Sequence, residues 1–256
     1  MGGFVRTSGS GLGCPDWPLC HGRLIPPFDF HTLIEYSHRM TGTLLGLLVL
    51  ALMVIALIND RQSRNTIILC STALSLVIVA GLLGGLTVLT DLVWWIRLVH
   101  LTIAQFLVAI LTLILWHTAS PVTQSSRSSA FSSPRGWKWK TGASLAIIFL
   151  LIISGSYMVG VGAGGSCASW PLCRGSLIPD GFVYAVHMGH RYIAVFATAF
   201  LAYVALTFII SGRTIRPLKR TAHLALGLMG LQLIVGALTV WSGFSVHLRV
   251  THLSIA

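Results

Sequence analysis

The chain has 256 residues, of which 55% are hydrophobic and only 9% charged, and its formal net charge is +11. Its apolar runs are longer than a core helix of a soluble domain requires, so the composition indicates a polytopic helical membrane protein and excludes an ordinary soluble one. The basic residues stand in short segments between these runs, as membrane topology favours, and we therefore reject nucleic-acid binding as the reason for the charge.

Six apolar segments are each long enough to cross a bilayer, which takes about 20 residues. A seventh begins near Arg249 and stops at the last residue, Ala256. The six are Thr32 to Ile58, Thr66 to Leu89, Trp94 to His117, Thr141 to Val161, Phe182 to Ile210 and Ala222 to Trp241.

Basic residues follow the first, third and fifth of these segments, and they include every lysine. By the positive-inside rule those connections are cytoplasmic, so the two cysteine-containing connections lie outside the cytoplasm. The basic residues concerned are Arg61, Arg64, Arg127, Arg135, Lys138, Lys140, Arg213, Arg216, Lys219 and Arg220.

An internal repeat organises the chain. Cys14 and Cys20 recur 153 residues later as Cys167 and Cys173, and GLTVLTDLVWWIRLVH, which ends at His100, is matched by ALTVWSGFSVHLRVTH, which ends at His252. A Ser-rich stretch with the composition of a flexible linker separates the copies. The sequence therefore predicts an N-terminal half (residues 1–122), a cytoplasmic linker (123–140) and a C-terminal half (141–256).

Four of the ten histidines take part in the repeat: His38, His100, His190 and His252. They lie inside apolar segments, where an ionisable side chain is costly and usually marks a site. Each pair is separated by 62 residues, enough to descend one helix, ascend the next and re-enter on a third, which places both members at a similar depth. Hydrogen bonding across helices is the alternative interpretation.

Paired histidines favour haem over zinc, because zinc needs a third or fourth ligand whereas haem iron needs two axial ligands. An apolar space between helices also accepts the macrocycle. Cations follow or precede the histidines and suit haem propionates; they are Arg39, Arg97, Arg191 and Arg249.

Glu35 breaks the symmetry, since its counterpart in the second half is His187. It stands three residues before His38, one helical turn away on the same face. A carboxyl group at that depth can exchange protons or stabilise a developing positive charge, so the first half is the candidate for chemistry. The alternative is an interfacial carboxylate paired with Arg39 or Arg97.

The cysteine pairs Cys14–Cys20 and Cys167–Cys173 are expected to form disulfides, because both fall on the oxidising side of the membrane. Two pairs of free thiols remain the alternative. The spacing does not match a Cys-x-x-Cys zinc site.

The stretches GGFVRTSGSGLGCPDWP, EYSHRMTG and VHLTIAQ, with the repeated His-Arg and Thr-His elements, resemble the haem A synthase family of cytochrome oxidase assembly proteins. The resemblance implies eight helices in two pseudosymmetric four-helix bundle halves. Against that pattern we expect most of the first and last helices to be lacking here, because Gly2 and Gly3 correspond by the repeat to Gly155 and Ser156, inside a membrane segment.

The family oxidises a ring methyl of haem O to the formyl group of haem A, with oxygen expected to come from water. By resemblance, His38 and His100 hold the substrate haem, Glu35 assists oxidation, and His190 and His252 ligate haem b. The implied location is the cell membrane, in contact with lipid, and the implied partners are haem O synthase, oxidase assembly factors and a second copy of the chain.

Two other classes of function use the same histidines. A di-haem b-type membrane cytochrome for electron transfer also needs paired imidazoles, but it gives no reason for Glu35. A haem-delivery factor without catalysis would return haem O unchanged.

Overall fold

The computed structural model describes residues 1–61, 63–119, 136–211, 214 and 216–255. The described residues form helices and no strands, apart from one isolated β-bridge in each cysteine-containing connection. The chain divides into two compact units, Met1–Ser126 and Arg127–Ala256. Residues 123–135 of the expected linker lie outside the described residues.

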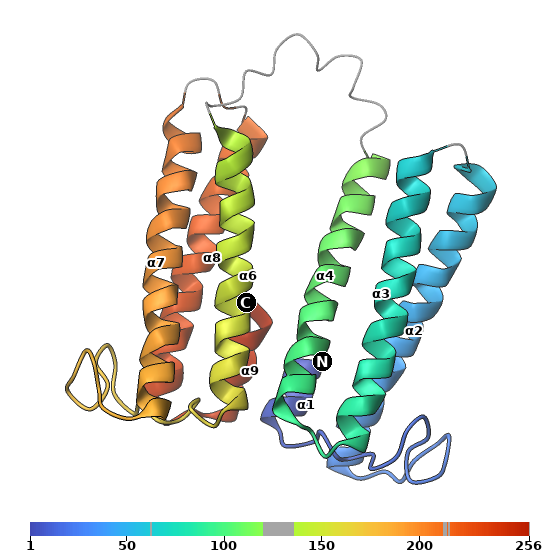
Figure 1. The fold of residues 1–256 in the computed structure, drawn as a ribbon, viewed down its shortest axis with the longest axis horizontal. Helices are drawn as coiled ribbons and strands as arrows, with labels where there is room; N and C mark the ends of the chain where they lie inside the picture. Colours follow the sequence, from blue (N-terminus) through green and yellow to red (C-terminus); the bar gives the residue numbers. More distant parts are fainter. Residues whose placement is uncertain (62, 120–135, 212–213, 215, 256) are drawn as a thin grey trace. The chain divides into compact units, whose positions relative to one another are not determined.

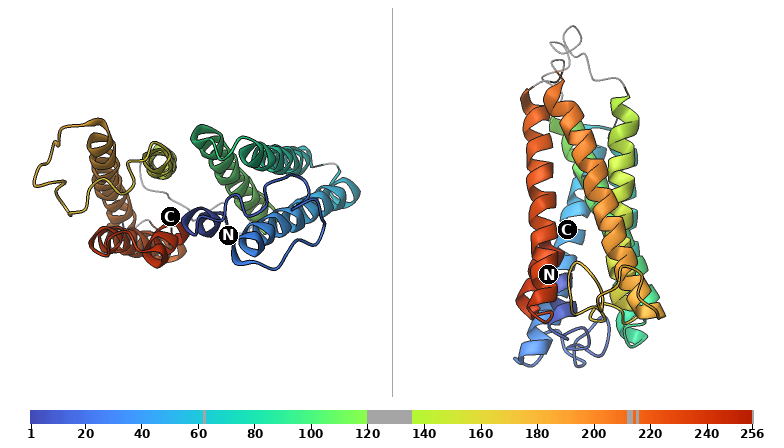
Figure 2. Two further views of the ribbon diagram at one scale, coloured as in Figure 1. Left: turned by 90° about the horizontal axis from the view of Figure 1, so that it is seen from below. Right: turned by 90° about the vertical axis from the view of Figure 1, so that its left-hand side faces the viewer.

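Unit 1 contains α1 (Gly2–Thr7), α2 (Phe30–Asn59), α3 (Arg64–Leu89) and α4 (Trp94–Ala119), with α3 lying between α2 and α4 (Figures 1 and 2). The first cysteine connection, residues 13–29, lies at the same end of this unit as the α3–α4 connection (Figure 1). We call it the first disulfide loop.

Unit 2 contains α6 (Trp137–Gly160), α7 (Phe182–Ile210), α8 (Arg216–Trp241) and α9 (Val246–Ile255). Here α8 packs against both α7 and α9, and α7 also packs against α6. Residues 165–181 form the second disulfide loop, which joins α6 to α7. Each unit thus has its disulfide loop at one end.

All six predicted membrane segments are confirmed as helices long and apolar enough to cross a membrane. Their ends follow local chemistry: the side chain of Asp29 caps α2 by accepting from the Thr32 amide, and Ser63 caps α3 by accepting from the Thr66 amide. α8 begins at Arg216 instead of Ala222, because its first turns contain basic residues and precede the apolar run.

A hydrophobic cluster joins α2, α3 and α4 in the half of unit 1 away from the first disulfide loop; its buried members are Val49, Ala56, Cys70, Ala73, Leu107 and Ile114. In unit 2 the corresponding cluster joins α7 and α8 through Val204, Ala205, Phe208 and Ala222. The four repeated histidines belong to neither cluster. They lie toward the disulfide-loop end of each unit. In unit 2 this end has a small hydrophobic cluster of its own, formed by Cys167, Cys173 and Met188.

Candidate functional site

His38 and His100 lie on α2 and α4, the two helices that flank α3. Among the described residues these helices pack along α3 and not against each other. The two imidazoles are nevertheless close enough for their charges to interact. α3 therefore holds α2 and α4 near each other but prevents direct packing between them.

Unit 2 repeats this arrangement with α8 in the place of α3. His190 on α7 and His252 on α9 lie within electrostatic reach of each other, while the described parts of α7 and α9 pack on α8 and not on one another. The structure therefore brings together the two histidines of each predicted pair, each within its own unit.

The hydrogen bond made by His100 fixes which ring nitrogen carries the proton. Its Nδ1 lies 2.9 Å from the carbonyl oxygen of Ala80, and a carbonyl can only accept, so Nδ1 is the donor. In the neutral ring Nε2 then keeps its lone pair, which is the form that binds a metal.

His190 reaches the same protonation state through a serine. Its Nδ1 lies 2.8 Å from Ser154 Oγ, and that hydroxyl already donates its hydrogen to the Leu151 carbonyl at 2.8 Å. Ser154 must therefore accept from Nδ1, which again leaves the lone pair on Nε2.

Within the described ranges, four buried polar atoms near these histidines have no hydrogen-bond partner: Arg97 Nε, Gln232 Oε1, Arg249 Nε and His252 Nδ1. Buried polar groups are nearly always paired, so each unpartnered group asks for an explanation. Arg97 and Arg249 stand at equivalent places in the repeat, three residues before His100 and His252. An acidic ligand bound between the histidine-bearing helices would supply what these two cations lack.

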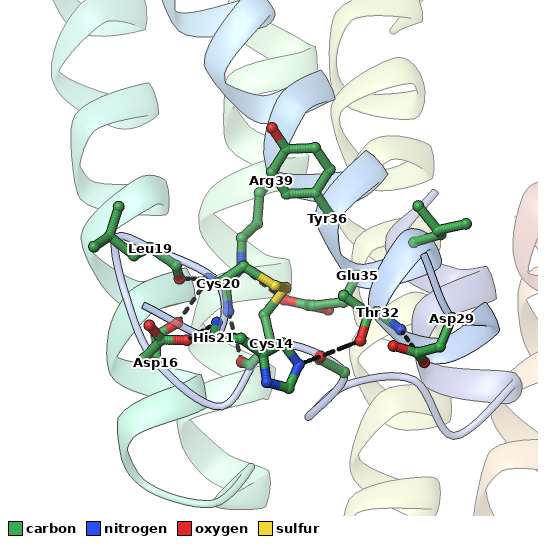
Figure 3. Close-up of a disulfide and its surroundings, with 12 residues drawn as sticks. Cys14, Asp16, Leu19, Cys20, His21, Asp29, Thr32, Glu35, Tyr36 and Arg39 are labelled. Carbon is green, nitrogen blue, oxygen red and sulfur yellow. Dashed lines mark hydrogen bonds and ion pairs between the residues drawn. A yellow bond between two sulfur atoms is a disulfide. The ribbon is translucent and has the colours of Figure 1, made fainter. Parts of the chain in front are cut away.

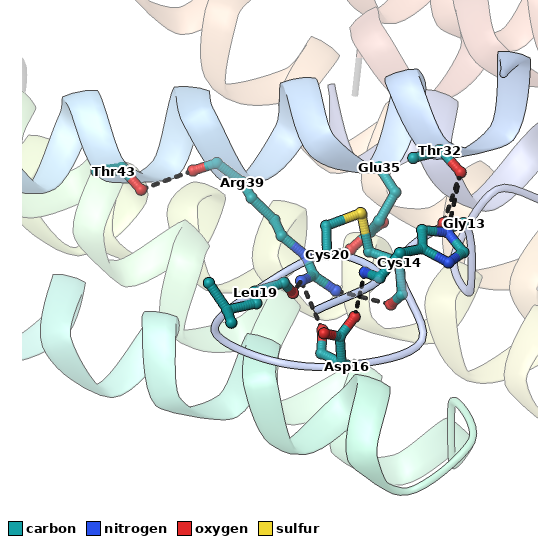
Figure 4. A network of polar contacts seen from close by, with 10 residues as sticks. Gly13, Cys14, Asp16, Leu19, Cys20, Thr32, Glu35, Arg39 and Thr43 are labelled. Atoms are coloured by element: carbon teal, nitrogen blue, oxygen red, sulfur yellow. Dashed lines mark hydrogen bonds and ion pairs between the residues drawn. A yellow bond between two sulfur atoms is a disulfide. The ribbon is translucent and has the colours of Figure 1, made fainter. Parts of the chain in front are cut away.

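Arg39 is occupied differently, because its guanidinium reaches into the first disulfide loop (Figures 3 and 4). Nη1 donates to the carbonyls of Asp16 and Leu19, both at 2.7 Å, and Nη2 donates to the carbonyl of Cys14 at 2.9 Å. With Nε donating to Glu35, four of the donors of this side chain are engaged, which leaves Arg39 little capacity for a further carboxylate ligand.

Arg191 clamps the second disulfide loop in the same manner. Its Nη1 donates to the carbonyls of Ser169, Pro171 and Leu172, and its Nη2 donates to that of Cys167. The two arginines that follow His38 and His190 thus hold loops, whereas Arg97 and Arg249 have buried nitrogen atoms without a partner.

Glu35 and His187 perform one structural task at matching positions. Glu35 is buried, and its Oε1 accepts from Arg39 Nε at 3.2 Å in an ion pair. His187 accepts from Arg191 Nη2 at 3.1 Å through Nε2, while its Nδ1 donates to the Ala163 carbonyl. Both nitrogens of His187 are used, so this residue has no free ligand atom, and Glu35 alone places a carboxylate at this position.

Both expected disulfides are present, and all four cysteines are buried. In the first loop the Asp16 carboxylate accepts from the amides of His21 and Gly22 at 2.6 and 2.7 Å. The Gly22 bond contributes most to lowering the pKa of Asp16 below its ordinary value. Asp16 is therefore charged at neutral pH, and its contribution to loop stability is lost only as the pH falls through that lowered pKa.

Replacing Arg39 by Gln should loosen the first disulfide loop, because three loop carbonyls lose a charged donor. We expect a loss of about 3 kcal/mol in stability and faster reduction of Cys14–Cys20 by dithiothreitol. The second loop serves as an internal reference. R23Q, which removes an exposed cation from the same loop, is the control; equal reduction rates in R39Q and R23Q would contradict the clamp.

The residues present fit haem in number and kind. Each unit supplies two imidazoles for the two axial positions of haem iron, and one of each pair, His100 or His190, is held with Nε2 free. The unpartnered Nε atoms of Arg97 and Arg249 suit propionates. Within the described ranges no group of three or more His, Cys, Asp or Glu side chains could hold a bare metal ion.

Sequence reasoning missed the groups that orient the histidines. The Ala80 acceptor is a backbone carbonyl, which has no residue-type signal. Ser154 occupies the place of Met1 in the repeat, so it lacked the recurrence that identified the histidines. The sequence feature that could have indicated Ser154 is its position in α6, the membrane segment directly before the helix that contains His190.

The comparisons with known proteins cover nearly the whole chain. Among curated relatives, a haem A synthase of Macrococcus caseolyticus is 28% identical over 98% of this chain and 85% of its own length. One of Exiguobacterium sibiricum is 30% identical over 98% of this chain and 83% of its own, and one of Symbiobacterium thermophilum is 30% identical over 93% and 79%.

The family model described as cytochrome oxidase assembly protein matches residues 1–29 and 27–256. The match therefore includes both disulfide loops and all four paired histidines. Together with the relatives it establishes that the chain belongs to the cytochrome oxidase assembly protein family.

Proposed function

We propose that this chain is a haem A synthase, an oxidoreductase that converts a ring methyl of haem O to the formyl group of haem A. The observation that carries the proposal is the repeated pairing of intramembrane imidazoles, in which His100 and His190 are held with Nε2 free. The names and coverage of the relatives support the same activity.

The two halves are assigned different haems. His38 and His100 hold the substrate, haem O, and His190 and His252 hold haem b as the resident cofactor. When bound, haem b supplies one-electron redox chemistry. Arg97 and Arg249 face the propionates in this proposal, because their Nε atoms are buried without partners, whereas Arg39 and Arg191 hold the disulfide loops.

The first half is assigned the chemistry because it contains Glu35. Conversion of the methyl group to the formyl group adds one oxygen atom from water and releases four protons and four electrons, and the electrons are taken up by an external oxidant. A carboxylate one turn from His38 can stabilise positive charge that develops at the methyl carbon and accept a proton from the attacking water. The corresponding His187 has both ring nitrogens engaged in hydrogen bonds. It can therefore neither stabilise positive charge nor accept a proton.

The ion pair with Arg39 keeps Glu35 in place for this role. Charge-assisted hydrogen bonds are short and directional, so the guanidinium restricts the rotamers of the carboxylate. Since the same guanidinium binds the loop carbonyls, the first disulfide loop and the position of Glu35 are coupled. Arg39 is thus a positioning residue.

The chain is proposed to lie in the cell membrane with both disulfide loops on the extracytoplasmic side. The exposed apolar residues of the spans, such as Leu47, Leu113 and Ile234, would contact lipid, which also gives a prenylated substrate lateral access. Haem O synthase, oxidase assembly factors and a second copy of the chain are the proposed partners.

The test is to express the full chain with a source of haem O and to identify the extracted haems by mass. Recovery of haem A together with haem b is the expected result. Recovery of haem O unchanged would indicate a delivery factor, and recovery of b-type haem alone in the presence of haem O would indicate an electron-transfer cytochrome; either result would overturn the proposal.

A further inference from the structure

Each of the four paired histidines faces a glycine on the helix that precedes its own in the chain. In all four cases the imidazole atom nearest to the glycine is Cε1. A Cβ added to the glycine would lie 3.3 Å from Cε1 of His38, 3.4 Å from that of His100, 3.0 Å from that of His190 and 3.2 Å from that of His252. These facing glycines are Gly2 on α1, Gly84 on α3, Gly155 on α6 and Gly236 on α8.

The facing glycines belong to the internal repeat. Gly155 follows Gly2 by 153 residues and Gly236 follows Gly84 by 152, the two offsets that relate the cysteines and the histidines. A glycine in a helix interior costs helix stability relative to alanine. Gly84, Gly155 and Gly236 are such interior positions, each opposite a paired histidine, and are explained better by close packing than by chance, while Gly2 is the first residue of α1.

At least one other glycine on each of α3, α6 and α8 has open space around it. A Cβ added to Gly81 on α3, Gly142 on α6 or Gly230 on α8 would meet no heavy atom within 4 Å. Each of these three helices therefore contains a matched control for the glycine opposite its histidine. On α3 a second glycine, Gly85, is also closely approached, but by the Trp17 ring, with an added Cβ 2.7 Å from Cδ2.

On α3 the facing glycine, Gly84, also leaves room for His100 to reach the backbone carbonyl that accepts its hydrogen bond. Gly84 stands four residues after Ala80, whose carbonyl accepts from His100 Nδ1. In an α-helix the side chain at i+4 lies above the carbonyl of residue i, so the missing Cβ leaves this carbonyl open. On α8 the carbonyl of Gln232 lies equivalently near the His252 imidazole, although its geometry falls short of a hydrogen bond to Nδ1.

On α6 the two contacts come from consecutive residues. Ser154 accepts from His190 Nδ1 at 2.8 Å, and a Cβ on Gly155 would lie 3.0 Å from Cε1 and 3.5 Å from Nε2 of the same ring. The ring cannot turn away from an added methyl group without breaking the Ser154 bond. The methyl would also crowd Nε2, the nitrogen that carries the free lone pair.

We propose that the four facing glycines are positioning residues that let each imidazole rest against a helix backbone with Nε2 directed at haem iron. This inference rests on the proposed function, because it takes the four histidines as haem ligands. A Cβ at Gly2, Gly155 or Gly236 would displace the ring by a few tenths of an ångström, whereas one at Gly84 would lie at the limit of ordinary van der Waals contact. An iron–nitrogen bond tolerates little misplacement of its ligand.

The test compares G155A with G142A, both on α6, in the full chain purified with haem b bound. We expect G155A to retain haem b about 10-fold more weakly and to alter its low-spin electron paramagnetic resonance signal, with G142A matching the wild type. Haem O binding by the first half should be unchanged in both variants. G236A, compared with G230A, should weaken haem b retention less than G155A does, because its Cε1 distance is 3.2 Å. G84A, compared with G81A, should weaken haem O binding least, because its Cε1 distance is 3.4 Å.

H190A separates failure of this inference from failure of the proposed function. If H190A leaves the haem b signal unchanged, the histidine is not a ligand, and both the proposed haem b site and the role of the facing glycines are overturned. If H190A abolishes the signal while G155A matches G142A, the glycine inference alone is overturned. Loss of haem from both halves in G155A would also overturn it, because displacement of one ring acts locally.

Discussion

Replacing Glu35 by Gln is expected to stop formation of the formyl group while leaving haem bound in both halves. The glutamine side chain has nearly the shape of the carboxylate. Its amide oxygen can still accept from Arg39 Nε, which in the wild type lies 3.2 Å from Glu35 Oε1. It carries no negative charge and is a poor proton acceptor, so turnover should fall by at least about 10²-fold. The measurement is haem A produced per protein, determined by extraction and mass analysis.

Two controls define what the Glu35 result means. H187Q changes the matching position of the second half, where the residue only accepts from Arg191 and donates to Ala163, and it should leave turnover near that of the wild type. E35A removes the Arg39 acceptor as well, so it should lose turnover and also loosen the first disulfide loop. Normal turnover in E35Q would show that Glu35 serves only as the partner of Arg39.

Removing the paired histidines is expected to affect the two halves independently. H190A or H252A should abolish retention of haem b, because one imidazole is lost and the other cannot complete a two-ligand site. H38A or H100A should instead abolish haem O binding and product formation while haem b stays bound. Optical spectra of the purified variants, before and after haem O is added, distinguish these outcomes.

His117 and His223 supply the matched controls for the histidine experiment. Both are exposed residues of the helices α4 and α8 and lie far along the chain from the paired positions. H117A and H223A should bind both haems normally. The assignment of one haem to each half would be wrong if H190A and H38A lost the same haem.

The sequence predicted the helices well because a membrane helix is specified by its apolar run. The segment from Phe182 to Ile210 has the observed bounds of α7. The prediction was poorer where polar residues extend a helix beyond that run: α6 begins at Trp137 and α8 at Arg216, both within basic stretches.

The paired histidines could also be predicted from sequence, because they recur at the same spacing in both copies of the repeat. The different environments of the arginines could not. All four stand within three residues of a paired histidine in sequence. Arg39, however, reaches carbonyls of the first disulfide loop, whereas Arg97 Nε has no partner among the described residues. Backbone carbonyls leave no trace in the residue pattern, and helix rotation decides which glycine faces a ring, so neither contact could be read from sequence.

The measurement that tests the central claim most directly is the electron paramagnetic resonance spectrum of the purified, oxidised full chain, recorded with the H190A and H252A variants. The account predicts a low-spin ferric signal typical of two imidazole ligands in the wild type, and its loss in either variant. A colourless protein, or a bound haem whose signal survives both substitutions, would contradict it.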